Sequence, residues 1–210
     1  SSSFRCRSEF SYKDNHYVMH DENKKIYMSS FYKASNVIQK VMPELLNEIN
    51  NSNSIKDKLF QINFRSNKNN NVMVTLIYHK NVESLVDKIK AISKKLEIQI
   101  ILRSKKYLYS TDDIFFEDHL DFQNLKIYQT DNCFYQPNRF LVDKMIFSVL
   151  DFIESPMDLL ELYCGVGTFT LPLSKIFNKV LATENDRNSI KCLFMSLDVN
   201  NISNVDHARL

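Results

Sequence analysis

The first part of the chain switches between strand and helix patterns. Apolar and polar residues alternate over residues 4–10, which predicts a strand with a charged outer face. Apolar residues then recur at helical spacing over residues 30–49, where Pro43 is expected to kink or split the helix. A polar run at residues 50–53 indicates a loop after this helix.

The next segment has the pattern of a hairpin followed by a helix and a strand. Alternating residues at 60–64 and 72–78 flank a polar stretch and predict two antiparallel strands. Helical spacing returns over residues 82–96, and a short apolar run at 98–102 indicates another strand. Together with the first elements, these patterns predict a small α+β domain over residues 1–128.

The pattern changes in the second part of the chain. Asn138 is a suitable N-cap for an amphipathic helix, and Ser155-Pro156 then breaks the chain. The expected order is a helix to residue 153, a strand at 159–163, a glycine turn, a helix at 169–176, a strand at 180–183 and a helix at 187–199. Alternation of strands and helices predicts the opening of a doubly wound parallel sheet over residues 129–210.

Composition narrows the class of protein. Of 210 residues, 44% are hydrophobic and 25% charged, which excludes a disordered or collagen-like chain. No apolar stretch approaches the roughly 18 residues of a membrane span, and no signal peptide is visible. The four cysteines lack metal-ligand spacing, so we expect no metal and a cytoplasmic location. Because the chain opens without Met, we expect a segment of a longer protein.

Glycine is the informative residue. Average usage of about 7% would give roughly 15 glycines, whereas the chain has 2, Gly165 and Gly167, both between a predicted strand and a predicted helix. Glu184 ends the next strand, at about the 20-residue separation that suits binding of ribose hydroxyls. These positions predict a nucleotide-like cofactor. The alternative is a simple tight turn and a surface carboxylate.

The loop also discriminates between cofactors. The dinucleotide fingerprint requires a third glycine, and Thr170 occupies that position, which disfavours an NAD-dependent enzyme. A P-loop is excluded because no Gly-Lys-Ser/Thr run is present. With Glu161 upstream, the two-glycine loop resembles the first motif of S-adenosylmethionine-dependent methyltransferases.

A combination of segments carries a more specific resemblance. LLELYCGVGTFTLPL, KVLATEND, FYQPN, LIYHK, FRCRSEF and KLFQINF together resemble the bacterial tRNA (uracil-5-)-methyltransferase family over nearly the whole chain. The resemblance implies an α+β RNA-binding domain followed by the first half of a Rossmann-like methyltransferase domain. It also implies S-adenosyl-L-methionine as cofactor and methylation of carbon 5 of the T-loop uridine of tRNA, forming 5-methyluridine. Ribosomal-RNA uracil-5-methyltransferases and a non-catalytic RNA-binding fragment remain alternatives.

Cofactor contacts follow from the resemblance, residue by residue. Thr168 stands where the family motif often has Asn, and its hydroxyl can still donate and accept. The implied cofactor-binding residues are Gln136, Tyr163, Gly165, Gly167, Thr168 and Glu184.

The chemistry requires groups that are not found in these 210 residues. Carbon 5 of uracil accepts a methyl group only after a thiolate adds at carbon 6, and a base then removes the carbon 5 proton. The resemblance implies that the nucleophilic Cys and the base Glu lie beyond residue 210, so this segment alone is expected to be inactive. Cys164 is interpreted as a structural residue.

RNA contact is expected in the first domain, from basic and aromatic side chains. The candidates are Arg5, Arg7, Phe60, Tyr78, His79 and Lys80. Phe60 and Tyr78 could instead fill the core, and Lys105-Lys106 is interpreted as a solvated face. The expected partner is the T-arm of tRNA or another tRNA-like RNA, bound by a monomer.

Overall fold

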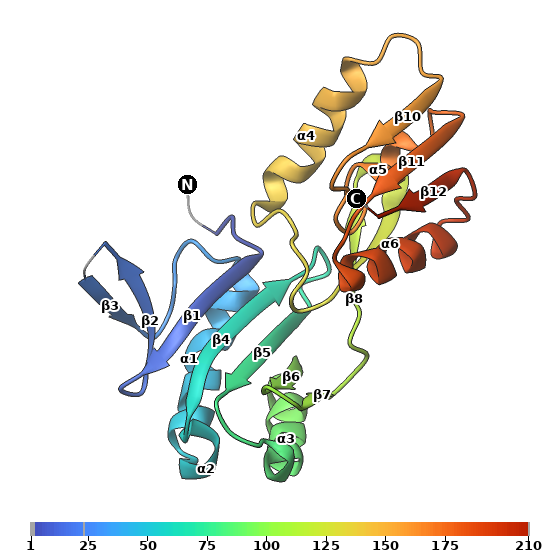
Figure 1. Cartoon of the computed structure of the whole chain (residues 1–210). Helices are drawn as coiled ribbons and strands as arrows, with labels where there is room; N and C mark the ends of the chain where they lie inside the picture. The colour runs from blue at the N-terminus through green and yellow to red at the C-terminus, as the bar shows by residue number, and fades with distance from the viewer. Residues whose placement is uncertain (1–2, 23, 210) are drawn as a thin grey trace. The chain divides into compact units, whose positions relative to one another are not determined.

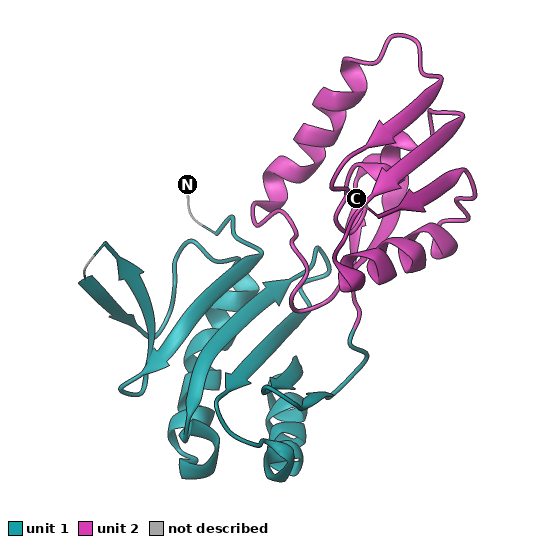
Figure 2. Cartoon of the chain, in the orientation of Figure 1, with its two compact units in different colours: residues 1–114 teal, residues 115–210 magenta. Residues whose placement is uncertain are grey.

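The computed structural model describes residues 3–22 and 24–209 and divides into two compact units (Figures 1 and 2). Unit 1 spans Ser1–Ile114 and unit 2 spans Phe115–Leu210. The elements of unit 1 are β1 (Arg7–Lys13), β2 (His16–Asp21), β3 (Lys24–Met28), α1 (Asn36–Asn50), α2 (Asn53–Lys56), β4 (Leu59–Ser66), β5 (Val72–Tyr78), the 3-10 turn η1 (Glu83–Leu85), α3 (Val86–Leu96), β6 (Gln99–Arg103) and β7 (Leu108–Ser110). Those of unit 2 are β8 (Phe116–Leu120), the 3-10 turn η2 (Phe122–Asn124), β9 (Leu125–Gln129), α4 (Arg139–Asp151), β10 (Asp158–Glu161), α5 (Thr170–Leu173), β11 (Lys179–Thr183), α6 (Arg187–Val199) and β12 (Val205–Ala208).

Unit 1 is a seven-stranded sheet with the order β3-β2-β1-β4-β5-β6-β7. All neighbours are antiparallel except β5 and β6, which are parallel and are joined through α3. The buried cluster of this unit combines residues of α1 and α3 with residues of the central strands (Figure 1). The predicted hairpin is confirmed, with Ile62 opposite Leu76.

The alternation predicted for residues 4–10 is confirmed around β1. Cys6, Ser8 and Phe10 are buried, whereas Glu9 between them is exposed. Phe10 packs in the core with its ring 5.5 Å from that of Tyr17, centroid to centroid. Burial of one face of β1 therefore fixes its register against β4.

Helix α1 corrects the expected start of the helix and excludes a split at Pro43. The helix begins at Asn36 rather than residue 30, and it is not split at Pro43. Proline removes one backbone donor from the ladder, but Pro43 lies on the exposed face, where water can satisfy the carbonyl left unpaired. The opposite face, which includes Ile38 and Leu45, is fully buried and holds the helix against the sheet.

Unit 2 contains a three-stranded parallel sheet with the order β10-β11-β12. Helix α4 starts at its predicted cap, where the Asn138 side chain accepts a hydrogen bond from the Phe140 amide. Helix α5 is shorter than expected and ends at Leu173. The residues that follow form turns, in which a backbone N–H donates to the carbonyl three residues earlier, as Lys175 N–H does to Pro172 O.

The hairpin β8–β9 belongs to unit 2, so the boundary between the units lies at residues 114–115 rather than at residue 128. The hairpin is part of unit 2 because β9 is hydrogen-bonded to α6. The Tyr128 amide donates to Ser196 Oγ at 2.9 Å, and the Lys126 amide donates to Asn200 Oδ1 at 3.0 Å. These bonds tie β9 to the last turn of α6.

Candidate functional site

The glycine turn follows β10 and contains three residues with positive φ. These are Tyr163 at +57°, Gly165 at +60° and Gly167 at +93°. A Cβ at Gly165 would meet nothing within 4 Å, whereas a Cβ at Gly167 would lie 2.6 Å from Leu193 Cδ1 of α6. Gly165 therefore leaves open space beside the backbone, and Gly167 allows the turn to pack closely against α6.

The end of β11 holds the glycine turn in place. The Cys164 amide donates to Thr183 O at 2.9 Å, and the Gly165 amide donates to Glu184 Oε2 at 3.0 Å. The other oxygen of Glu184, Oε1, accepts from the amides of Asn185 at 2.7 Å and Asp186 at 2.8 Å. One carboxylate thus connects the turn, the end of the strand and the start of α6.

Thr170 occupies the position of the third glycine and has a defined role. Its side chain is fully buried, and its hydroxyl donates to Glu161 Oε2 at 2.6 Å. Burial raises the pKa of the Glu161 carboxyl above its usual value, and the hydrogen bond from Thr170 opposes this shift. The pair joins the end of β10 to the start of α5.

A pocket of about 470 Å³ opens beside the turn, within the size range of small-molecule sites. Four of the six predicted cofactor residues line it: Gln136, Tyr163, Gly165 and Thr168. Gly167 and Glu184 do not line it; Gly167 is buried against α6, and Glu184 lies behind the Gly165 amide. Gly167 thus has a packing role against α6, and its contact with the cofactor stays a prediction.

Phe134, which was not among the predicted cofactor residues, also lines the pocket. Its side chain is largely exposed although it is a large aromatic residue. The only signal in the sequence was its place two residues before Gln136 in FYQPN. Apolar walls combined with the polar groups of Gln136 and Thr168 suit a ligand with an aromatic ring and hydroxyl groups.

Cys164 has the properties of a structural thiol. It is buried, and burial together with the nearby carboxylates of Glu161 and Glu184 raises the pKa of its thiol to about 12. A thiol with this pKa is not ionised near neutral pH, and the thiolate is the nucleophilic form. The other three cysteines of the chain are buried as well.

In unit 1, two of the predicted RNA contacts form an aromatic pair. The rings of Phe60 and His79 lie 4.5 Å apart, centroid to centroid, with an interplanar angle of 56°. Phe60 is 46% exposed, and His79 is also exposed. Phe60 on β4 and His79 directly after β5 therefore present aromatic surface to solvent.

Tyr78 corrects the prediction for RNA contact. Its side chain is 2% exposed, and its hydroxyl donates to Ile55 O at 2.8 Å, so it belongs to the core. Lys80 lies beside it, and its ammonium donates to Ser54 O at 2.8 Å and to Asp57 Oδ2 at 3.1 Å. Lys80 is therefore anchored in place rather than extended into solvent.

Arg5 and Arg7 are half-buried and already engaged within the chain. Arg5 Nε donates to Arg7 O at 3.3 Å, and Arg7 Nε donates to Glu9 Oε1 at 2.7 Å. Their guanidinium groups remain partly exposed, but the contact with Glu9 reduces the charge that Arg7 presents.

A glycine turn after the first parallel strand, with a carboxylate at the end of the second, defines unit 2 as a Rossmann-like cofactor-binding unit. The sequence profile of the tRNA (Uracil-5-)-methyltransferase family matches residues 1–210. The chain belongs to this family.

Individual relatives agree with the family match. The chain is 38% identical over 218 residues to the tRNA/tmRNA (uracil-C(5))-methyltransferase of Campylobacter lari, covering 99% of this chain and 62% of the relative. It is 41% identical over 199 residues to that of Aliarcobacter butzleri, covering 92% of this chain and 53% of the relative. The chain thus spans little more than half the length of these relatives.

A solved structure has the same fold. The tRNA (uracil-54, C5)-methyltransferase of Pyrococcus abyssi, crystallised with S-adenosyl-L-homocysteine, superposes with a TM-score of 0.82 at 16% identity. The match covers 100% of this chain and 56% of that one. It confirms the expected fold class: an α+β unit followed by part of a Rossmann-like methyltransferase domain.

Within residues 3–22 and 24–209, no helix combines the length and apolar character needed to cross a membrane. Within the same residues, no cluster of three or more His, Cys, Asp or Glu side chains has the geometry to hold a metal ion.

Proposed function

We propose that this chain forms the RNA-binding unit and the first half of the methyltransferase domain of an enzyme that methylates carbon 5 of uridine in the T-loop of tRNA. The family match over residues 1–210 carries the proposal, and the pocket beside Gly165 supports it. The cofactor is S-adenosyl-L-methionine and the product is 5-methyluridine. Relatives are named for both tRNA and tmRNA, so a T-arm in another tRNA-like RNA is a second substrate of the same kind.

The pocket residues fit this cofactor. The open face of Gly165 lets a ligand approach the backbone, and Gln136, Tyr163 and Thr168 offer polar groups around the same space. An ionised carboxylate has about four acceptor positions, and Glu184 uses three of them for backbone amides. Glu184 is only partly buried, and we propose that its fourth position accepts from a ribose hydroxyl of the cofactor at the margin of the pocket. When bound, the cofactor supplies an electrophilic methyl group.

The nucleophile is expected outside these 210 residues. Addition to carbon 6 of uracil requires an accessible thiolate, whereas the four cysteines are buried and the pKa of Cys164 is about 12. We infer that a Cys nucleophile and a Glu base are supplied by sequence beyond Leu210.

RNA recognition is assigned to unit 1. Phe60 and His79 together offer stacking surface for an unpaired base, as T-loops contain. Partly exposed Arg5 and Arg7 are secondary candidates for phosphate contact. We expect the protein to act as a monomer in the cytoplasm.

The test is transfer of a labelled methyl group by the complete gene product. T-arm RNA should gain label in 5-methyluridine, and a T-arm in which the T-loop uridine is replaced by cytidine should gain none. Label in a ribosomal-RNA fragment instead of the T-arm would favour the ribosomal alternative. The 210-residue chain alone should transfer no label; any transfer would place a nucleophile within it, and Cys164→Ser would be the first variant to test.

A further inference from the structure

A groove of about 910 Å³ runs along one edge of the unit 1 sheet. The strands β5 and β6 are parallel, with Ile77 opposite Arg103, so the carboxyl ends of both strands lie beside the groove. The residues that follow each strand form the two walls. Those that matter here are His79, Lys80, Arg103, Lys105, Lys106 and Tyr107.

The groove is strongly basic. Its lining includes the basic residues Lys80, Arg103, Lys105 and Lys106 and the carboxylate of Glu83. Because Lys80 is paired with Asp57, most of the excess positive charge comes from the exposed Lys105 and Lys106. A concave surface with one sign of charge concentrates its field and attracts ligands of opposite charge. The ligand favoured here is therefore a polyanion rather than a neutral molecule.

The two exposed lysines are held by a tight hairpin. Arg103 pairs with Leu108, and the Ser104 amide donates to Tyr107 O at 2.9 Å, so Lys105 and Lys106 form the two-residue loop between β6 and β7. Both side chains are exposed, and within the part of the chain that the structure describes neither ammonium has an ion-pair partner. Their earlier interpretation as a general solvated face omits this placement at the groove.

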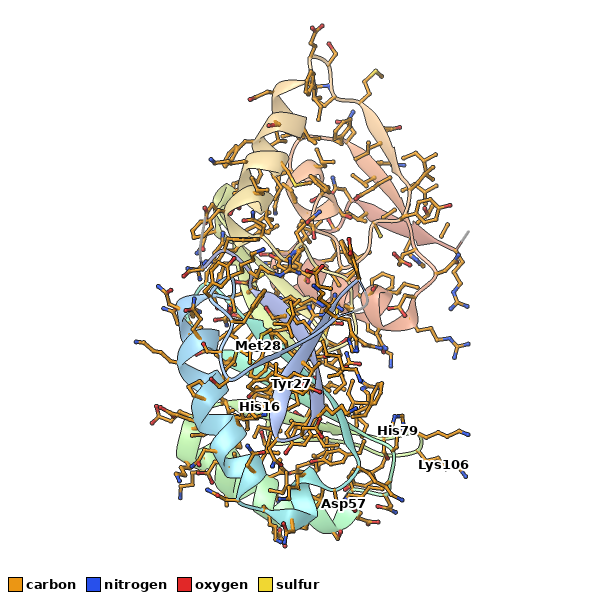
Figure 3. The ribbon with its side chains drawn as sticks, turned by 90° about the vertical axis from the view of Figure 1, so that its left-hand side faces the viewer. His16, Tyr27, Met28, Asp57, His79 and Lys106 are labelled. Carbon is orange, nitrogen blue, oxygen red and sulfur yellow. The ribbon has the colours of Figure 1, made fainter. Side chains whose placement is uncertain are left out.

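One end of the groove reaches the aromatic pair. His79 lines the groove and also contacts the Phe60 ring. Figure 3 shows His79 and Lys106 on the same side of unit 1. Stacking surface for a base thus continues into a row of cations, the combination by which proteins bind a single strand along its backbone.

We propose that this groove binds the phosphodiester backbone of the RNA strand whose base stacks on Phe60 and His79. Lys105 and Lys106 contact phosphates directly, while Lys80, which Asp57 holds in place, lines the same groove. This inference rests on the proposed function, because it extends the RNA surface of the same unit.

The test measures binding of a fluorescent T-arm RNA to the 210-residue chain by anisotropy over a range of KCl concentrations. Lys105→Gln/Lys106→Gln removes the two exposed groove cations. The matched control is Lys94→Gln/Lys95→Gln, which removes the same charge from α3, where Lys95 pairs with Glu48 outside the groove. Urea unfolding followed by circular dichroism checks that unit 1, which carries all of these substitutions, is folded in each variant.

Each lost phosphate contact lowers the slope of log affinity against log salt by about 0.7 to 0.9, so the groove variant should lose about 1.5. If the plots of log affinity against log salt for the variant and the unmodified chain meet near 1 M KCl, the variant should bind about 30-fold more weakly at about 0.1 M KCl. The control pair should keep the slope of the unmodified chain. Phe60→Ala should weaken binding with the slope unchanged, because stacking releases few counterions.

The outcomes separate the two proposals. If the unmodified chain fails to bind T-arm RNA, RNA recognition by unit 1 is wrong. If the chain binds but Lys105→Gln/Lys106→Gln behaves like the control pair, the groove proposal is overturned and the proposed function stands. Competition by polyglutamate as effective as competition by single-stranded RNA would assign the groove to acidic peptides and also overturn the proposal.

Discussion

Alanine at each glycine of the turn should have opposite effects on stability and on cofactor binding. Both substitutions place an L-residue at positive φ, at a cost of about 1–2 kcal/mol. At Gly167 the new Cβ would also overlap Leu193 Cδ1 at 2.6 Å, and overpacking of this kind costs about 1–3 kcal/mol. Gly167→Ala should therefore lower the free energy of unfolding by about 3 kcal/mol, and Gly165→Ala by about 1 kcal/mol.

Cofactor affinity should follow the reverse order. The Gly165 side of the turn faces open space in the pocket wall, so a methyl group there occupies volume meant for the ligand. We expect Gly165→Ala to weaken binding at least about tenfold, or about 1.4 kcal/mol. Folded Gly167→Ala should bind nearly as well as the unmodified chain, since its methyl group points at α6.

The assays are urea unfolding followed by circular dichroism and calorimetric titration with S-adenosyl-L-homocysteine. A control variant, Gly167→Ala/Leu193→Ala, should be less destabilised than the sum of its two single changes, because removing Leu193 Cδ1 relieves the overlap. The reasoning would be refuted if Gly165→Ala were as destabilising as Gly167→Ala, or if Gly165→Ala kept full affinity.

Two further predictions concern the buried groups of each unit. Burial raises the pKa of Glu161, so between its ordinary and its raised pKa the folded state binds more protons than the unfolded state, and the free energy of unfolding falls as pH rises. Glu161→Gln should remove this contribution to the pH dependence of unfolding, measured from about pH 4 to 8. An unchanged pH dependence would contradict the prediction. Tyr78→Phe leaves Ile55 O without its donor and should lower the free energy of unfolding by about 1–2 kcal/mol. The affinity for T-arm RNA should not change. A folded Tyr78→Phe variant with lower RNA affinity would show that Tyr78 contacts RNA.

The parts of the fold with strong local signals could be predicted from sequence. The turn at Gly165 followed from the scarcity of glycine, and the strand at Phe10 from strict alternation. By contrast, β2 and β3 were missed. The two buried residues of β2, Tyr17 and Val18, are adjacent and so do not alternate, and β3 has no buried side chain. A strand without a buried face is invisible to pattern analysis.

The errors at the candidate sites have a tertiary origin. The pattern around Tyr78 left both a core position and RNA contact open, and only the burial of β5 on both faces places Tyr78 in the core. Gly167 owes its role to Leu193, which is distant in sequence and meets the turn only through the packing of α6. Likewise, Lys105 and Lys106 became informative only once β5 and β6 were seen to end at one edge.

The triple amide contact of Glu184 means that the cofactor turn is shaped before any ligand arrives. The entropy of ordering residues near Gly165 is lost during folding, so binding does not bear that cost and the site is preorganised. Because the same carboxylate also braces the start of α6 through the Asp186 amide, it serves as a shared structural joint. A lower affinity in a Glu184 variant would therefore combine the effect of a loosened turn with loss of the proposed ribose contact.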